Sequence, residues 1–90
     1  MKSIIQSKKQ CYICGKSTFL HDHHIFEGSR RQKSEEYGLK VWLCVFHHTG
    51  QDGAHNASWM RDRLHKIGQR KFEETHTREE FIKIFGKSYL

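Results

Sequence analysis

Short patterns of apolar and polar residues predict two strands in the first half of the chain. Residues 19–26, FLHDHHIF, have apolar residues at both ends and polar residues between them, which is typical of a strand with one exposed face. Residues 38–44, GLKVWLC, are rich in β-branched and aromatic residues and predict a second strand. The polar stretch 27–37, EGSRRQKSEEY, predicts a loop. We therefore expect a β-hairpin with a long basic loop.

The pattern changes to a helical period after residue 58. Basic residues alternate there with apolar residues at helical spacing, which predicts a basic amphipathic helix that begins near Trp59. The turn residues 49–53, TGQDG, precede it, and Asn56 or Ser58 is the expected N-cap. The apolar positions expected to face the core are Met60, Leu64, Ile67 and Phe72.

A short second helix is predicted at the C-terminal end. Thr77 and Glu80 have the spacing of a capping box, with Thr77 as the N-cap, and Gly86 is suited to end the helix. The expected buried side consists of Phe81, Ile82 and Phe85. The whole pattern therefore predicts an α+β fold.

The composition indicates one small basic domain whose core needs a further source of stability. The 90 residues include 16 Lys and Arg, 10 Asp and Glu, three Cys and eight His, and the net charge is +6. A chain of this length with 36% hydrophobic residues buries a thin core. No repeat or linker divides it, so we expect a single domain over 1–90. Within it, 1–10 is a loosely held arm, 11–60 the motif core and 59–90 the helical part.

Cysteine usage and hydropathy exclude two protein classes. Three thiols cannot all pair in disulfides, and the sequence contains neither a secretory leader nor an apolar run of 18 residues. A disulfide scaffold and a membrane-spanning protein are therefore not expected. We expect an intracellular domain in which Cys and His bind metal and whose positive charge favours a polyanionic partner.

All three cysteines and one histidine form two half-sites for a tetrahedral metal ion. Cys11-x2-Cys14-Gly has the form of a zinc knuckle, and Cys44-x2-His47 follows after 29 intervening residues. No His pair follows Cys14 at the interval of a DNA-reading C2H2 finger. We predict a structural Zn²⁺ on these four residues. The alternative is that Cys44 is a buried strand residue and His47 a surface residue.

The order of these motifs resembles the zinc-containing HNH endonucleases, also called ββα-metal or His-Me finger nucleases. Small phage and prophage members are the most similar. The resemblance covers residues 11 to about 60 and is carried by the zinc half-sites, by DHHI at 22–25 and by VWLC at 41–44 with the histidine pair at 47–48. It implies a zinc-stapled ββα-metal finger around one catalytic divalent cation. It also implies a cytoplasmic location in a bacterium or a phage-infected host cell.

The resemblance further implies roles for individual histidines. His24 corresponds to the family's general base and His23 to a ligand of the catalytic ion, which is expected to be Mg²⁺ or Mn²⁺, with another divalent ion possible. A further ligand is implied at the start of the helical part, where His48 is the first choice and His55 the second. Leu39 stands where the family has an Asn that orients the base. What orients His24 is left open, with a carbonyl or side chain of 30–36 as the candidate.

These residue types suit phosphodiester hydrolysis. A neutral imidazole can accept a proton from water near pH 7, because its unperturbed pKa is about 6.5. Adjacent residues on a strand point to opposite faces, so His23 and His24 are expected to have different roles. His21 and Asp22 are either partners that fix a ring tautomer or surface residues.

Three basic residues of the predicted loop are candidates for contacts with DNA phosphates: Arg30, Arg31 and Lys33. Arg30 is in addition a candidate for stabilising the charged transition state. An ordinary solvated loop is the alternative for all three.

The sequence therefore predicts a metal-dependent DNA endonuclease of the HNH type that leaves 5′-phosphate and 3′-hydroxyl ends. Its binding to DNA would be dominated by the phosphate backbone. Two alternatives stay open. One is a non-catalytic zinc-binding module for nucleic acid, and the other is a phage accessory protein that docks a partner through the basic helix 59–72.

Overall fold

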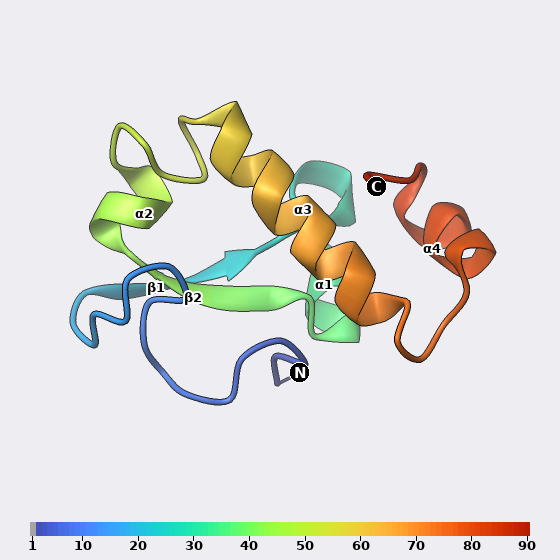
Figure 1. Cartoon of the computed structure of the whole chain (residues 1–90), viewed down its shortest axis with the longest axis horizontal. Coiled ribbons are helices and arrows are strands. Elements are labelled where there is room, and N and C mark those ends of the chain that lie inside the picture. Colours follow the sequence, from blue (N-terminus) through green and yellow to red (C-terminus); the bar gives the residue numbers. More distant parts are fainter. Residues whose placement is uncertain (1) are drawn as a thin grey trace.

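A two-stranded antiparallel hairpin with helices packed around it forms the fold (Figure 1). The structure is a computed structural model and describes residues 2–90. Strand β1 spans Leu20–His24 and β2 spans Lys40–Cys44. The connection between them contains the 3-10 turn η1, Gly28–Arg30, and the helix α1, Arg31–Tyr37. Three helices follow β2: α2, Val45–Thr49; α3, Ser58–Phe72; and α4, Arg78–Phe85. The predicted α+β class and the hairpin are confirmed.

The strand register divides the hairpin into a core face and an outer face. Leu20 lies opposite Cys44, and His24 lies opposite Lys40. Because side chains alternate, one face carries His21, His23, Val41 and Leu43, and the other carries Asp22, His24, Lys40 and Trp42. Val41 and Leu43 are fully buried, so theirs is the core face. His23 and His24 therefore lie on different faces, as expected.

Aromatic side chains dock the C-terminal helix onto the end of the hairpin. The ring centroid of Phe26, just after β1, lies 5.3 Å from that of Phe81 and 4.7 Å from that of Phe85. Phe81 and Phe85 are buried, one turn apart on α4, whereas Ile82 is 41% exposed. The prediction that Ile82 is buried is wrong, because a step of about 100° turns it away from the stripe of the two phenylalanines.

Residues 31–37 form a helix, so the predicted loop over 27–37 is wrong for most of its length. The stretch lacks an apolar stripe, but Arg, Gln, Lys and Glu are good helix formers. Ser34 is fully buried, and its hydroxyl donates to the carbonyl of Phe26 and accepts from its N–H, both at 2.9 Å. Gly38 ends the helix with φ of 70°. These bonds fix α1 against the residues that follow β1.

The N-terminal segment is more firmly placed than its weak periodicity predicts. The N–H of Ile4 donates to the carbonyl of Gly38 at 2.9 Å, and the Gln6 side-chain oxygen accepts from the N–H of Trp42 at 2.9 Å. In Figure 1 this segment and α3 lie on opposite sides of the hairpin. The N-terminal segment therefore runs along the outer side of β2 and is hydrogen-bonded to it, whereas the sequence predicts a loosely held arm.

The ends of the two long helices show one wrong and one correct capping prediction. Helix α3 begins at Ser58 with Ala57 at its N-cap and no side-chain capping bond. The Asn56 amide instead donates to the carbonyls of Thr49 and Gly50 at the end of α2. On α4, the capping box of Thr77 and Glu80 is present, and Gly86 ends the helix in the left-handed conformation.

No helix in residues 2–90 has the length and apolar character needed to span a membrane.

Candidate metal centres and active site

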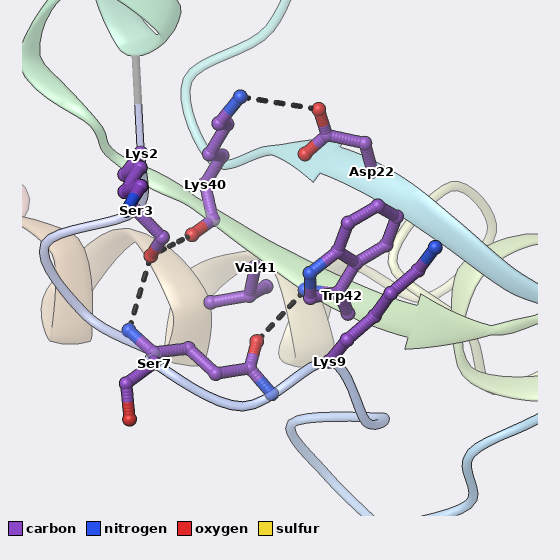
Figure 2. Close-up of a pocket in the computed structure, with 9 residues that line it drawn as sticks. Lys2, Ser3, Ser7, Lys9, Asp22, Lys40, Val41 and Trp42 are labelled. Atoms are coloured by element: carbon purple, nitrogen blue, oxygen red, sulfur yellow. Dashed lines mark hydrogen bonds and ion pairs between the residues drawn. The ribbon is translucent and has the colours of Figure 1, made fainter.

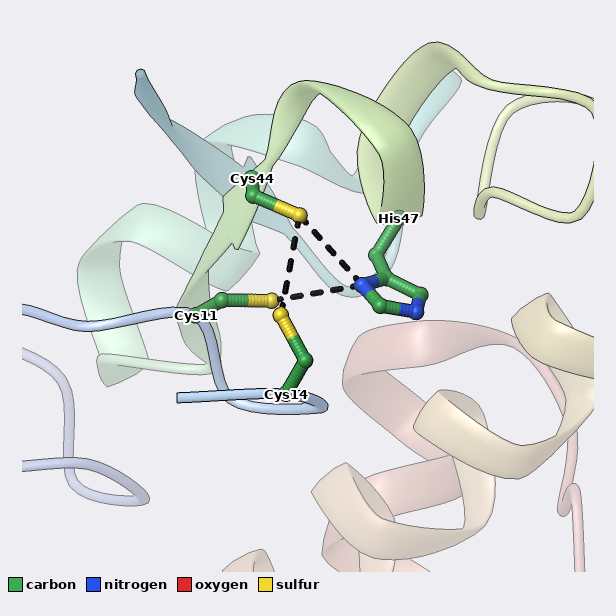
Figure 3. A group of neighbouring side chains, drawn as sticks. All are labelled: Cys11, Cys14, Cys44 and His47. Carbon is green, nitrogen blue, oxygen red and sulfur yellow. Dashed lines mark hydrogen bonds between the residues drawn. The ribbon is translucent and has the colours of Figure 1, made fainter. Parts of the chain in front are cut away.

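Three sulfurs and one imidazole converge at the end of the hairpin where β2 stops (Figure 3). We call Cys11, Cys14, Cys44 and His47 the Cys3His cluster. His47 Nδ1 lies 3.6 Å from Cys11 Sγ and 3.3 Å from Cys44 Sγ, and the sulfurs of Cys14 and Cys44 are 3.9 Å apart. A tetrahedral zinc ion with bonds of about 2.0 to 2.3 Å separates its ligand atoms by roughly 3.3 to 3.8 Å. The cluster could therefore hold a metal ion such as zinc, as the spacing predicts.

Local backbone geometry brings the two half-sites together. The Cys11 carbonyl accepts from the Gly15 N–H at 2.8 Å, and Gly15 adopts φ of 79°, which closes the knuckle turn. The N–H of Tyr12 donates to the carbonyl of Trp42 at 2.8 Å and so ties the knuckle to β2. Cys44 is the last residue of β2, and the single turn of α2 returns His47 to it.

The electrostatics of the Cys3His cluster favour a bound cation. Burial acts to raise the pKa of the Cys11 thiol, but backbone hydrogen bonds, first from Cys44, outweigh it and lower that pKa to about 6. At Cys14, a backbone hydrogen bond from Lys16 acts to lower the pKa. Partial desolvation and the sulfurs of Cys11 and Cys44 nevertheless leave it raised. A metal cation relieves this repulsion between neighbouring thiolates.

A second cluster consists of His23, His48 and His55, which we call the histidine trio. Their ring nitrogens lie within 4.8 Å of one another, and the Nε2 atoms of His48 and His55 are 2.9 Å apart. The other ring nitrogen of His48 lies 2.7 Å from His21 Nδ1. His47 and His48 are consecutive on α2, so a rotation of about 100° sends one to each cluster. The Gly50–Ala57 segment then folds back on α2, where the His55 N–H donates to the His48 carbonyl at 3.0 Å.

Burial keeps two members of the histidine trio, His23 and His48, in their neutral, ligating form. His23 is only 4% exposed, and this burial, with the neighbouring His48, lowers its pKa to about 4. Burial, followed by the charges of His55 and His21, lowers the pKa of His48 to about 4 as well. Both rings are therefore unprotonated near pH 7 and present lone pairs. Three imidazoles suit zinc, iron, nickel or copper ions better than Mg²⁺, which prefers oxygen ligands.

On the outer face, His24 is held by a carboxylate. His24 Nε2 lies 2.7 Å from Glu35 Oε1, and both carboxylate oxygens of Glu35 accept from Lys40 Nζ at 3.0 Å. Lys40 also contacts the Asp22 carboxylate at 3.3 Å. An ionised carboxylate only accepts hydrogen bonds, so Nε2 of His24 carries the hydrogen and Nδ1 is left as the proton acceptor. Glu35 belongs to the 30–36 segment that was the candidate for orienting this ring.

One pocket connects the two histidine faces at the end of β1. This histidine pocket has a volume of about 210 Å³. Its lining combines the histidine trio with His24 and Asp22, and α1 and the preceding turn add Arg31 and Glu27. A neighbouring hollow of about 490 Å³ is also lined by His24, Arg31 and Glu35. The edge position of β1 thus lets a single ligand reach residues from both faces of the strand.

The three basic residues predicted to contact phosphate have different positions. Only Arg31 lines the histidine pocket. Arg30 Nη1 donates to the Ile84 carbonyl at 3.0 Å, so its guanidinium is bound to the end of α4, and the prediction of a catalytic Arg30 is not supported by its position. Lys33 pairs with Glu36 at 3.2 Å on an exposed side of α1.

Two further charged residues near the trio were not singled out from the sequence. Arg61 lines a cavity of about 230 Å³ together with His23, His55 and Glu27. The Arg61 guanidinium also donates to the Ala54 carbonyl at 3.1 Å. Its place in the first turn of a basic helix is a weak signal, because most basic helix residues only contact solvent. Nothing in the sequence around Glu27 indicates a functional residue. It lies at the pocket because the chain turns there after β1.

Comparisons with protein-family models, curated proteins and solved structures give no match for this chain. The geometry and chemistry of the two clusters are therefore the basis for assigning a function.

Proposed function

We propose that this protein is a metal-dependent endonuclease of the HNH type that hydrolyses DNA phosphodiester bonds to 5′-phosphate and 3′-hydroxyl ends. The observation that carries the proposal is the composition of the histidine pocket. A histidine oriented by a carboxylate, His24, opens onto the same pocket of about 210 Å³ as the three imidazoles of the histidine trio. A general base beside a cation site is the combination that hydrolysis of a phosphodiester needs.

His24 is the proposed general base. With Nε2–H donated to Glu35 at 2.7 Å, the Nδ1 lone pair accepts a proton from the attacking water. The Glu35 carboxylate holds the ring in this tautomer and stabilises the imidazolium that forms. Lys40, 3.0 Å from Glu35, favours the ionised form of that carboxylate. General base catalysis of this kind contributes on the order of 10²- to 10⁴-fold to a rate.

The histidine trio is the proposed holder of the catalytic cation. The 2.9 Å between the His48 and His55 nitrogens fits two adjacent ligands of an octahedral ion, which are about 3.0 Å apart for bonds of about 2.1 Å. A divalent cation bound there would withdraw charge from the scissile phosphate and stabilise the leaving oxygen. The imidazole ligands support a transition-metal ion more than Mg²⁺. Both His48 and His55 thus belong to the proposed ligand set.

Positive charge around the histidine pocket supports a polyanionic substrate. Arg31 lines the pocket, Arg61 lines the adjoining cavity, and the net charge of the chain is +6. Guanidinium groups bind phosphate oxygens in a bidentate way and stabilise charge that builds up during phosphoryl transfer. Of the three basic residues predicted to contact phosphate, Arg31 is therefore the one that we retain, and it takes the transition-state role predicted for Arg30.

The Cys3His cluster has a supporting role in this proposal. It joins the knuckle, the end of β2 and the first turn of α2, and so it fixes the backbone that carries His48. A closed set of four protein ligands is typical of structural zinc, whereas three ligands and an open pocket are typical of catalytic sites.

Cleavage of supercoiled plasmid tests the proposal. The protein is incubated with Mn²⁺, Ni²⁺, Zn²⁺ or Mg²⁺ in parallel, beside His24→Ala and a control, His76→Ala, whose ring contacts Phe72 and Tyr37 away from the pocket. We expect nicked or linear DNA from the wild-type protein and the control, and a loss of about 10²- to 10⁴-fold in His24→Ala. Nicks that DNA ligase seals directly would verify 5′-phosphate and 3′-hydroxyl ends.

Equal activity of the folded His24→Ala protein would contradict the role of His24. DNA binding without cleavage under any of the four ions would instead favour a non-catalytic nucleic-acid module.

A further inference from the structure

A second and larger hollow lies on the outer face of the hairpin, between the N-terminal segment and β2 (Figure 2). We call it the tryptophan hollow. Its volume is about 530 Å³, which is in the range of small-molecule sites. Three lysines, Lys2, Lys9 and Lys40, line it together with Trp42 and Asp22. An aromatic ring surrounded by cationic side chains is the usual composition of a site for unpaired nucleotides.

The face of the Trp42 indole is covered by one flexible side chain. Lys9 Nζ lies 4.8 Å from the centroid of the ring, and Figure 2 shows the lysine extended alongside it. A cation–π contact of this kind on a partly exposed ring is weak, and the lysine stem has four rotatable bonds. A nucleobase can therefore displace the Lys9 ammonium from the ring. The released ammonium then stays close enough to contact the adjoining phosphate.

The hollow is preformed and keeps two uncompensated charges. The hydrogen bond between Gln6 and the Trp42 backbone, and another from Ser3 to the Lys40 carbonyl, hold the N-terminal segment at a fixed distance from β2. Within residues 2–90, the ion pairs of the structure do not include Lys2 or Lys9. Lys40, by contrast, is already paired with Glu35 and Asp22.

The tryptophan hollow and the histidine pocket share one lining residue, Asp22. The strand register places Trp42 opposite Asp22 and Lys40 opposite His24 on the same face. The two pairs are two residues apart, which is about 7 Å along a strand. A polynucleotide strand with one phosphate at His24 can therefore place a neighbouring nucleotide over Trp42.

We infer that the tryptophan hollow binds an unpaired nucleobase of a DNA strand, stacked on Trp42 and with adjacent phosphates on Lys9 and Lys2. A base inside a duplex is already stacked on both sides and paired at its edge, so it must leave the duplex to reach the ring. The site therefore selects single-stranded DNA, frayed ends or junctions. That the stacked nucleotide lies next to the scissile phosphate rests on the proposed function. The binding of the base to Trp42 does not depend on it.

Tryptophan fluorescence tests this site without any cleavage. The chain has two tryptophans, so Trp59→Phe leaves Trp42 as the single indole. This variant is titrated with an oligothymidylate of eight nucleotides, without added divalent ions. A blunt duplex, and the same oligomer with abasic sites, serve as ligand controls. We expect saturable quenching by the single strand and clearly weaker binding of the duplex and the abasic oligomer.

Three variants measure the contributions of the ring and the charge with a labelled oligomer. Loss of a stacked base weakens binding roughly 5- to 150-fold, so we expect this for Trp42→Leu and a smaller loss for Trp42→Phe, which keeps an aromatic ring. Trp59→Phe should bind like the wild-type protein. Lys9→Gln should reduce the salt dependence of binding by about 0.7 in the log–log slope, the value for one phosphate of a single strand.

The outcomes separate this inference from the proposed nuclease activity. Unchanged binding by a folded Trp42→Leu protein, or equal binding of the abasic oligomer, would overturn the stacking site even if the protein cuts DNA. Single-strand binding that depends on Trp42 in a protein that cuts nothing would support the site and contradict the nuclease. Zinc content and circular dichroism verify folding. If Trp42→Leu does not fold, the comparison of the intact and abasic oligomers on the wild-type protein decides the question.

Discussion

The Cys3His cluster and the histidine trio each take one residue from helix α2, but they differ in ligand chemistry and in how open they are. The first offers three sulfurs and one nitrogen as ligands from the knuckle, β2 and α2, and its four positions leave no vacancy in a tetrahedral site. The second offers three nitrogens and opens onto a pocket of about 210 Å³ that also holds His24 and Arg31. One set of side chains could enclose a metal ion completely, and the other lines an open pocket.

Helix α2 shows how little sequence separates these two kinds of site. His47 and His48 are adjacent, yet Nδ1 of His47 faces Cys44 Sγ at 3.3 Å and Nε2 of His48 faces His55 at 2.9 Å. A metal ion held by His47 would thus also fix the position of the neighbouring residue of the histidine trio. We expect changes to the Cys3His cluster to unfold the protein and changes around the trio to alter chemistry while the fold persists.

The largest effect is expected for Cys44→Ser. Structural zinc in small domains contributes on the order of 10 kcal/mol to folding, which is comparable to the total stability of a domain. We expect this variant to lose its zinc and its cooperative thermal transition, measured by metal analysis and circular dichroism. His48→Ala is the matched control and should keep both. A zinc-free Cys44→Ser protein with a normal melting transition would contradict the structural role of the cluster.

A smaller effect, on rate alone, is expected for Glu35→Gln. The amide can orient the His24 ring in the wrong tautomer, so we expect plasmid cleavage to fall roughly 10- to 100-fold, mostly in kcat. The neighbouring Glu36→Gln removes a similar charge, which is paired with exposed Lys33, and this variant should cleave normally. Equal losses in both variants would show that only the net charge matters and that Glu35 does not position the base.

The smallest effect concerns pH and the metal-free trio. Burial lowers the pKa of His23 to about 4 in the folded protein, whereas an unfolded His has a pKa of about 6.5. The free energy of unfolding therefore contains the full contribution of neutral His23 above about pH 6.5. That contribution falls as the pH decreases toward 4, since the unfolded state then binds more protons. Between pH 7 and 5.5 we expect His23 to account for about 1 kcal/mol of lost stability.

Urea unfolding of the wild-type protein and His23→Gln at both pH values measures this contribution. The difference between the two proteins removes the acid sensitivity of the Cys3His cluster, which both proteins share. An identical pH dependence in the two proteins would show that His23 is not buried in its neutral form.

The features that the sequence predicts well are those fixed by local spacing. Alternation of polar and apolar residues located the first strand, and a run of β-branched and aromatic residues located the second. The two half-sites around Cys11 and Cys44 converge into one cluster as predicted. The capping box at Thr77 and the end of α4 at Gly86 depend on contacts within a single helix, so they too could be predicted.

The features that could not be predicted depend on contacts between distant segments. Helix α1 has no apolar stripe, and its place is set by Ser34, whose hydroxyl bonds the backbone of Phe26. The same helix directs Glu35 toward His24, while the preceding turn sends Arg30 to the carbonyl of Ile84 at the other end of the chain. Nothing in the local pattern of RRQKSEE distinguishes these charged side chains, so their roles appear only in the fold.

Counting and exchanging metal ions tests the contrast between the closed and the open site most directly. The purified protein is dialysed against excess Mn²⁺ or Ni²⁺, freed of loose ions, and analysed for metals, cleavage activity and circular dichroism before and after mild chelation. We predict one zinc per chain that stays bound, and one added ion that chelation removes together with activity while the fold is unchanged. Cleavage that persists after the added ion is gone, or that disappears only when zinc is lost and the protein unfolds, would contradict a separate open metal site at the histidine trio.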